Sequence, residues 1–396
     1  MGGSTRGRTE GRNKIKICIA STWKSLCGIS TYSNYQTSEL QKLNPDLFIL
    51  AEDRTDSGPD DTQQSTLPYS ECWSRYRGFD RVLDVIKQQK PDIIHWSHEF
   101  GLFCLTKKTM LEYLDLLEKI NKLNIKQTIV YHSVPHVLGN PFFSEYFERS
   151  SSFFDKIIVH TDEQMFKLIE YKVPQSKLVH INHGVLLCPL YDKQEARKKL
   201  GIPQNKKVVM SMGFFGGLKG VDELIGIHAE LIKTDPNILF YFVGGLHYAT
   251  AIYGRDYMKQ CFKNILNKGL KDKFIITGFV HEDLLPWYYA ASDLAVLNYK
   301  PSGYLSASGC SAKLVASKRL IVTTDGTHRN DEIRNGKECI KIHYADMEGL
   351  TRTIQNVINH PDENIINNAY SYAQENQWAT AAKKHMEIWN EIGNRI

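Results

Sequence analysis

The sequence has no long apolar run. A membrane-spanning helix needs roughly 18 or more consecutive apolar residues, and no segment approaches that length, so no transmembrane span is expected. The eight cysteines form no C-x-x-C pair and are spread along the chain. This spacing favours reduced, mostly buried thiols in a cytoplasmic protein.

The sequence also has little excess of charge of either sign. Lys and Arg total 49 and Asp and Glu total 44, a net charge of +5. The sequence lacks both the clustered charge and the interleaved aromatic residues of nucleic-acid binders, so nucleic acid is not an expected partner. Anionic small molecules or a lipid surface suit the mild charge equally. Four lysines of one predicted helix favour a membrane surface or an acceptor, or form a solvated face: Lys107, Lys108, Lys119 and Lys122.

Residues 1–13 are rich in glycine and arginine and lack the apolar core of a signal peptide. We expect a disordered basic tail there and assign it no function. The remaining chain, with 42% apolar residues overall, has enough apolar material for a sizeable core.

Short apolar runs alternate with longer amphipathic segments, which predicts an α/β fold with parallel sheets. The first set of predicted strands covers 14–20, 46–51, 91–97, 126–133 and 155–161. The pattern restarts with strands at 206–213, 237–245, 273–279, 294–299 and 319–324. The segment 186–203 has no clean period and contains two prolines, so we place the domain junction there.

The predicted fold is two doubly wound, Rossmann-like domains that face each other across a cleft. The domains cover 14–188 and 189–368, and 369–396 is helical by pattern. Because ligands bind at the carboxyl ends of parallel strands, the chemistry is expected in that cleft.

Polar residues and glycines follow the strands of the first half. Gly28 precedes a predicted helix, and a glycine there lets the backbone approach an anion closely. An ordinary tight turn with Ser30 or Thr31 as the helix N-cap explains this glycine equally well. His98 and Glu99 suit hydrogen bonds to sugar hydroxyls, or form a solvated loop pair. His132 and His136 follow the next strand. Each is a candidate for a general base or for a hydrogen-bond donor to a hydroxyl, or else is a structural histidine.

The second half holds two helix starts that favour anions. Lys219 ends a glycine-rich turn that begins at Gly213, which supplies backbone N–H groups and a cation. Val221 stands where a P-loop requires Ser or Thr, which disfavours a P-loop nucleoside triphosphatase. Ser308 and Gly309 open another helical segment. Two such starts in one domain indicate a nucleotide diphosphate, and no ligand spacing indicates a metal.

In combination, these motifs resemble the retaining glycosyltransferases of family 4, in the GT-B class and its mannosyltransferase-like branch. The order and spacing run from about residue 14 to 335. The carrying segments are Cys27 to Thr31, His98 to Phe103, His132, Ile181 to Val185, Gly213-Phe214, Lys219-Gly220, Leu285 to Asp293, and Ser308-Gly309.

The resemblance implies a role for each matching position. The first domain takes the acceptor, the second takes the nucleotide sugar, and the last helix crosses back to the first. The catalytic residues are His132, beside the transferred sugar, and Glu99. The donor-binding residues are Gly28, Ser30, Gly213, Lys219, Gly220, Ser308 and Gly309 near the phosphates, with Phe279 at the nucleobase. Beyond the resemblance, we expect His98, His136 and Lys313 to contact the sugar or the acceptor. Lys313 departs from the family pattern, so it meets a phosphate or an acidic sugar, or else is a solvated helix residue.

The implied reaction transfers a mannose- or glucose-type hexosyl group to a glycan or lipid-linked acceptor. The donor is a nucleotide-diphosphate sugar of unspecified base, and neither a cofactor nor a metal is required. Negative charge develops on the β-phosphate, where Lys219 and the start of the helix at Ser308 would stabilise it. We nominate no enzymic nucleophile. The expected location is cytoplasmic, with peripheral contact at the inner face of a membrane.

The chain departs from the family at three positions. Phe214 replaces a frequent arginine, and Leu305 and Lys313 replace a Glu-x7-Glu pair that this branch often lacks. These departures leave open a non-catalytic sugar-nucleotide-binding protein. A nucleotide-sugar epimerase of the same fold would need an acid and a base in the cleft, and a nucleic-acid-modifying transferase, suggested by the basic tail, is the third alternative.

Overall fold

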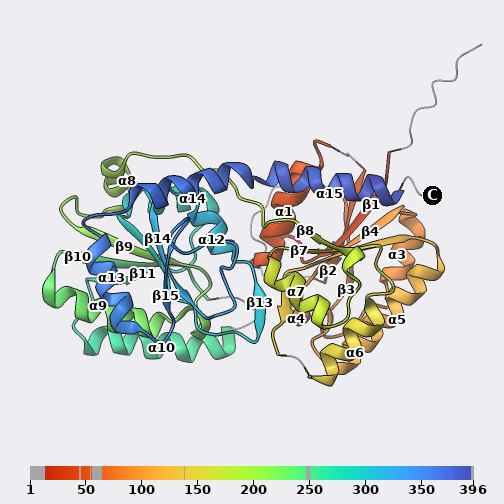
Figure 1. Ribbon diagram of the computed structural model, residues 1–396, viewed down its shortest axis with the longest axis horizontal. Coiled ribbons are helices and arrows are strands. Elements are labelled where there is room, and N and C mark those ends of the chain that lie inside the picture. The colour runs from red at the N-terminus through yellow and green to blue at the C-terminus, as the bar shows by residue number, and fades with distance from the viewer. Residues whose placement is uncertain are drawn as a thin grey trace, which may run out of the picture.

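Two parallel β-sheets organise the chain (Figure 1). The computed structural model describes residues 14–43, 46–53, 55, 65–137, 139–246 and 251–393. The basic tail expected at 1–13 lies outside the described residues. Each sheet has helices on both faces and its own apolar core, as predicted for two doubly wound domains.

The first sheet has the order β3-β2-β1-β4-β5-β7-β8. Its strands are β1 (Ile17–Ser21), β2 (Leu47–Glu52), β3 (Tyr69–Trp73), β4 (Ile93–His98), β5 (Lys126–Tyr131), β7 (Lys156–Val159) and β8 (Leu178–His180). Its helices are α1 (Gly28–Leu40), α3 (Val82–Gln89), α4 (Phe100–Phe103), α5 (Lys107–Lys122), α6 (Pro141–Ser150) and α7 (Asp162–Glu170). Central strands such as β1 are buried along their whole length, because helices cover both faces.

The second sheet has the order β11-β10-β9-β12-β14-β15. Its strands are β9 (Lys207–Met212), β10 (Ile238–Val243), β11 (Phe274–Ile276), β12 (Leu294–Leu297), β14 (Leu320–Asp325) and β15 (Ile340–His343). Its helices are α8 (Lys193–Leu200), α9 (Val221–Thr234), α10 (Ala251–Asn267), α11 (Leu285–Ala291), α12 (Gly309–Leu314), α13 (Met347–Val357) and α14 (Glu363–Glu375). In both sheets the order changes direction beside the first strand, β1 or β9, which creates the crevice where such folds bind ligands.

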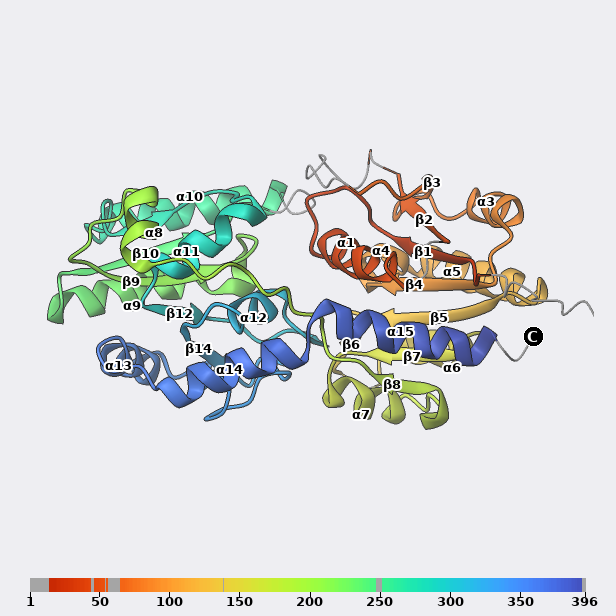
Figure 2. The same cartoon turned by 90° about the horizontal axis from the view of Figure 1, so that it is seen from above.

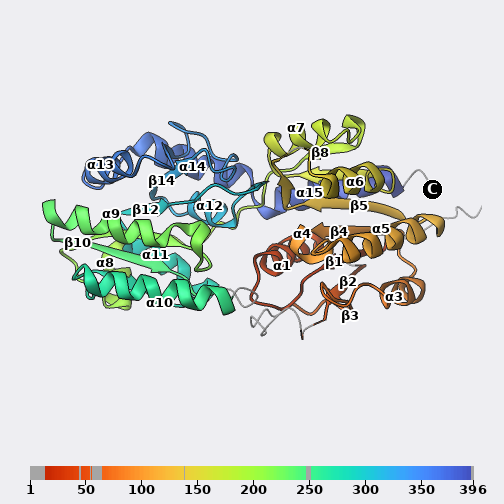
Figure 3. The ribbon, with the colours of Figure 1, turned by 90° about the horizontal axis from the view of Figure 1, so that it is seen from below.

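Two features join the domains. Strand β13 (Tyr304–Ser306) of the second domain pairs antiparallel with β6 (Ser133–Pro135) of the first. Helix α14 ends on the second domain, and after a break at 376–377 the helix α15 (Trp378–Gly393) lies across the first (Figure 2). Helices α1 and α15 cover one face of the first sheet, whereas α5 and α6 cover the other (Figure 3).

Candidate active site

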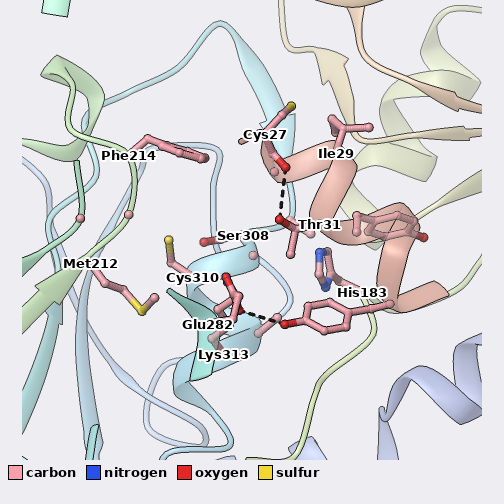
Figure 4. Close-up of a pocket in the computed structure, with 18 of the residues that line it drawn as sticks. Cys27, Ile29, Thr31, His183, Met212, Phe214, Glu282, Ser308, Cys310 and Lys313 are labelled. Carbon is pink, nitrogen blue, oxygen red and sulfur yellow. Dashed lines mark hydrogen bonds and ion pairs between the residues drawn. The ribbon is translucent and has the colours of Figure 1, made fainter. Parts of the chain in front are cut away.

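The carboxyl ends of both sheets face a cavity of about 810 Å³ between the domains. Figure 4 shows Cys27, Thr31 and His183 of the first domain opposite Met212 and Ser308 of the second. Of the predicted site residues, the cavity lining contains Gly28, Glu99, His132, Gly213, Lys219, Phe279, Ser308, Gly309 and Lys313. The predicted residues outside the lining are Ser30, His98, His136 and Gly220.

The α1 helix presents its first turn to this cavity. Gly28 is the first residue of the helix, and a Cβ atom added there would meet nothing within 4 Å, so the backbone faces open space. The backbone oxygen of Cys27 accepts a hydrogen bond from the Thr31 hydroxyl at 3.2 Å. Ser30 is fully buried instead, and its Oγ accepts the Ser25 N–H at 3.1 Å. Ser30 stabilises the loop before α1 from its buried side and does not reach the cavity, so its predicted contact with the donor or acceptor is wrong.

Three histidines and one tyrosine form a cluster in the first-domain wall of the cavity. His132 Nε2 lies 2.8 Å from the Ser97 hydroxyl, and its ring meets the edge of Tyr32 at 4.5 Å between centroids. His160 lies 5.6 Å from His132 and 5.5 Å from His183, again between ring centroids. All three histidines keep part of their surface at the cavity while their rings pack against one another.

The electrostatics of this wall follow from burial. Burial lowers the pKa of His132 well below its usual value, and the neighbouring histidines add to the effect. Burial likewise lowers the pKa of His160 to about 3 and that of His183 to about 4. At neutral pH the wall therefore consists of uncharged imidazoles, which exchange hydrogen bonds with hydroxyl groups but offer no positive charge.

Glu99 also lines the cavity. Its carboxylate accepts the Ser133 hydroxyl at 2.7 Å and the Phe100 N–H at 3.0 Å, which caps the short helix α4. Burial raises the pKa of this carboxyl above its usual value, although both hydrogen bonds and the charge of Arg329 oppose the shift. Glu99 and His132 thus both line the cavity, as the sequence predicts.

The two remaining histidine predictions, direct contacts with sugar or acceptor, are wrong. His98 points to the opposite face of β4 from Ser97, because side chains alternate along a strand. It is fully buried among aromatic rings, with Tyr131 at 5.0 Å between centroids, and its Nε2 lies 3.2 Å from the Tyr146 hydroxyl. The His136 ring stacks on His328 at 3.6 Å between centroids, and the His136 backbone N–H donates to the Gly303 carbonyl oxygen, so His136 joins the domains outside the cavity.

On the opposite wall, Lys219 occupies the glycine-rich turn after β9. Its ammonium group donates to the Tyr299 hydroxyl at 2.9 Å and lies 4.1 Å above the centre of that ring. Burial lowers the pKa of Lys219, and the positive charge of Arg329 adds to the effect. Among the described residues no carboxylate forms an ion pair with Lys219, so its charge faces the cavity uncompensated.

Two glycines shape this turn. Gly213 has φ +129° and lies so near β10 that a Cβ atom on Gly244 would come 1.9 Å from its carbonyl oxygen. Gly220 has φ +54°, and a Cβ atom there would lie 2.3 Å from the Asn298 amide nitrogen. Gly220 therefore fixes the backbone at the start of α9 and does not line the cavity, which corrects its predicted role in binding the donor.

The start of α12 also differs from the expectation. Ser308 caps the helix through Ser311, and its Oγ lies 2.6 Å from the Tyr299 hydroxyl. Its backbone N–H donates to Glu332 at 3.0 Å, so this N–H is already occupied rather than open to a diphosphate. Burial raises the pKa of Glu332 to about 7. Gly309, the first helical residue, remains at the cavity surface.

A bridge closes one side of the cavity. The Tyr35 hydroxyl donates to Glu282 at 2.9 Å, and the other carboxylate oxygen of Glu282 pairs with Lys313 (Figure 4). Phe279 lies exposed at the rim, 55% of its surface accessible. Lys313 thus reaches the cavity as predicted, but it is paired with a carboxylate that the sequence reading did not select.

The sequence reading missed several lining residues. His160 follows β7 and His183 follows β8, so the rule that selected His132, a histidine at the end of a strand, would have found both. Glu282, Tyr35 and Arg329 carried no comparable signal, because tertiary contacts alone bring them to the site.

Among the residues that the structure describes, no group of three or more His, Cys, Asp or Glu side chains is arranged to hold a metal ion. None of the helices in the described ranges combines the length and apolar character that crossing a membrane requires.

Comparison with known families decides the class of protein. A model described as glycosyl transferases group 1 matches residues 192–372, and a model described as glycosyltransferase family 4 matches 27–187. The chain belongs to the GT-B glycosyltransferases. The two matches meet within the segment where the sequence pattern breaks, and together they include both walls of the cavity.

Individual relatives of this glycosyltransferase are distant. The α-monoglucosyldiacylglycerol synthase of Streptococcus pneumoniae is 24% identical over 72% of the chain and 65% of the relative. A D-inositol 3-phosphate glycosyltransferase of Corynebacterium aurimucosum is 24% identical over 59% of the chain and 56% of the relative. The glycosyltransferase thus spans less than two thirds of the length of these curated relatives.

Solved structures share the fold. The Anabaena protein HepE, crystallised with UDP, superposes with a TM-score of 0.74 over 95% of the glycosyltransferase and 100% of HepE, at 15% identity. At that identity the likeness establishes the two-domain GT-B architecture alone.

Proposed function

We propose that this glycosyltransferase transfers a mannose- or glucose-type hexosyl group from a nucleotide-diphosphate sugar to a hydroxyl of a glycan or lipid-linked acceptor, with retention of anomeric configuration. One observation carries the proposal. An uncompensated lysine, Lys219, faces a wall of neutral histidines across a single cavity between the domains. The first suits a diphosphate leaving group, and the second suits a sugar.

Departure of the leaving group is the step that the second domain assists. As the bond between the sugar and the phosphate breaks, negative charge grows on the β-phosphate. The ammonium group of Lys219 stabilises that charge where it forms, with little reorganisation, because Tyr299 already holds it in place. The exposed ring of Phe279 at the rim offers a contact for the nucleobase.

The first domain acts on the sugar and the acceptor. A neutral His132 donates or accepts a hydrogen bond at a sugar hydroxyl, and its Ser97 partner fixes the ring. Glu99, with its raised pKa, also lines the cavity and would accept the proton of the incoming hydroxyl. Closure of the domains excludes water and favours transfer over hydrolysis. No step requires a metal.

The relatives indicate the donor base and the acceptor. UDP is present in the HepE structure, and the pneumococcal relative is named as a glycolipid synthase. We propose a cytoplasmic enzyme in peripheral contact with a membrane. The four lysines that suggested this contact are paired with acidic residues, at 2.6 Å for both Lys119 to Asp115 and Lys122 to Glu118, so the α5 surface is largely neutralised. The membrane contact therefore needs its own test by liposome flotation.

Product analysis tests the activity. The protein is incubated with UDP-glucose, UDP-galactose, GDP-mannose or GDP-glucose, with diacylglycerol or a small glycan as acceptor. We expect nucleoside diphosphate and an α-linked product from one of these α-linked donors. Conversion of the donor to another nucleotide sugar without acceptor would instead identify an epimerase. Tight binding with neither transfer nor hydrolysis would identify a binding protein.

A further inference from the structure

Arg329 lies in the loop between β14 and β15 and lines the cavity. A backbone bridge to Ser306 fixes the loop just before the start of α12. The Nε atom of Arg329 is buried, and it has no hydrogen-bond partner among the described residues. A buried donor of a charged group normally has an acceptor, because leaving it unpaired is costly. The position therefore suits an anionic ligand.

Arg329 shares an aromatic ring with Lys219. Its guanidinium carbon lies 5.9 Å from the centre of the Tyr299 ring, and the Lys219 ammonium lies 4.1 Å from the same centre. No described carboxylate forms an ion pair with either cation. Two like charges that converge on one ring, without a counter-charge in contact, repel each other until an anion enters between them.

We propose that Arg329 is the second cation for the diphosphate of the donor, a proposal that rests on the proposed function. Phe214 occupies the position where the resemblance to family 4 implies an arginine, so the turn after β9 supplies only Lys219. A lysine acts as a compact point charge, whereas a guanidinium forms two parallel hydrogen bonds to phosphate oxygens. Arg329, in the loop after β14, thus supplies the second positive charge that the turn after β9 lacks.

Glu99 offers the competing role for Arg329. The positive charge of Arg329 opposes the rise in the pKa of Glu99, so the two groups sense each other across the cavity. If Arg329 serves only as a counter-charge for Glu99, its loss leaves the affinity for a nucleoside diphosphate unchanged. If Arg329 contacts the diphosphate, its loss weakens that affinity and spares the nucleoside.

Calorimetry of three variants separates these roles. UDP, GDP or ADP, whichever the wild type binds most tightly, is titrated into wild type, Arg329→Gln, Arg329→Lys and Arg334→Gln, and the matching nucleoside is titrated as a reference. Arg334 is the matched control, because it pairs with Glu338 outside the cavity. We expect Arg329→Gln to weaken diphosphate binding tenfold to a hundredfold, Arg329→Lys to weaken it less, and Arg334→Gln to leave it unchanged.

Circular dichroism first shows that each variant is folded, and Arg329→Lys stands in if Arg329→Gln is not. Unchanged diphosphate affinity in the folded variants overturns the assignment of Arg329 alone. An equal loss of nucleoside affinity also overturns it, because the effect would then be a general distortion of the site. A wild type that binds none of UDP, GDP and ADP overturns the proposed function, and the assignment with it.

Discussion

Tyr35 of α1 donates a 2.9 Å hydrogen bond to Glu282 of the second domain. The two residues are 247 positions apart, yet they close one side of the cavity. Glu282 also pairs with Lys313, so three side chains form one bridge between the domains. The bridge must break whenever the domains separate to admit a donor or release a product.

Loss of this bridge should favour the open enzyme. A hydrogen bond to a charged group contributes on the order of 1.5–3 kcal/mol, so Tyr35→Phe should raise the KM for the donor about tenfold or more. The control is Tyr76→Phe, a change at an exposed tyrosine, which should leave KM unchanged. Steady-state kinetics measures KM, and small-angle X-ray scattering should show a larger radius of gyration. Unchanged values of both would mean that the bridge does not hold the domains together.

Removal of the Lys219 charge should weaken donor binding. Lys219→Ala deletes a charge-assisted phosphate contact, which costs on the order of 1.5–3 kcal/mol. Isothermal titration calorimetry with the nucleoside diphosphate measures the loss. The matched control is Lys206→Ala, a lysine that contacts Asn237 and does not line the cavity. Equal affinities of wild type and Lys219→Ala would remove Lys219 from the phosphate site.

His132→Ala should impair turnover rather than binding. A contact that strengthens in the transition state affects kcat, so we expect kcat to fall by ~10²-fold or more with donor affinity nearly intact. His136→Ala provides the control, since the structure places His136 outside the cavity and its removal should change kcat only a few-fold. Near wild-type turnover of folded His132→Ala, or an equal loss in both variants, would show that His132 is not the group that acts on the sugar.

Stability should fall in mild acid. Burial holds the pKa of several histidines below the usual value, namely His95, His98, His132, His160, His183, His228 and His385. The unfolded chain binds protons at these groups below about pH 6.5 and the folded chain does not, so the free energy of unfolding falls by up to ~1.4 kcal/mol per pH unit for each histidine.

Glu332, Asp331 and Glu99 oppose this trend. Burial raises the pKa of Glu332 to about 7, that of Asp331 to about 6 and that of Glu99 above its usual value, so their contribution to stability is lost as pH rises from the unfolded pKa values through the folded ones. These three carboxyls do not offset the seven histidines, and the net change between pH 6.5 and 5 should be a loss. Urea unfolding at pH 7 and pH 5 measures it. Equal or greater stability at pH 5 would mean that these histidines are protonated in the folded protein.

The sequence predicted the two sheets well, because strands covered on both faces appear as continuous apolar runs. It missed β3, whose residues Tyr69 to Trp73 mix polar and apolar side chains at the sheet edge, and β8, which is only three residues long. It also missed β15, the four-residue edge strand of the second sheet. For short elements of this kind, tertiary contacts rather than local pattern set the structure.

The site was predicted where a residue follows a strand or opens a helix, as Lys219, His132 and Gly28 do. The errors have a physical cause. Strand alternation turns His98 into the core, and packing against Asn298 rather than ligand contact requires Gly220. The Tyr35–Glu282 bridge was beyond prediction, because no local pattern relates one residue of α1 to a loop of the other domain.

The most direct test of the central claim is thermal unfolding in the presence of nucleotide sugars. A ligand at about 100 times its dissociation constant adds ~2.7 kcal/mol to the stability of the folded state. We predict that one nucleotide-diphosphate sugar raises the Tm of the wild type by several degrees, that the shift grows with the logarithm of its concentration, and that Lys219→Ala greatly reduces it. Absence of any shift across UDP-, GDP- and ADP-linked hexoses at millimolar concentration would contradict a donor site between the domains.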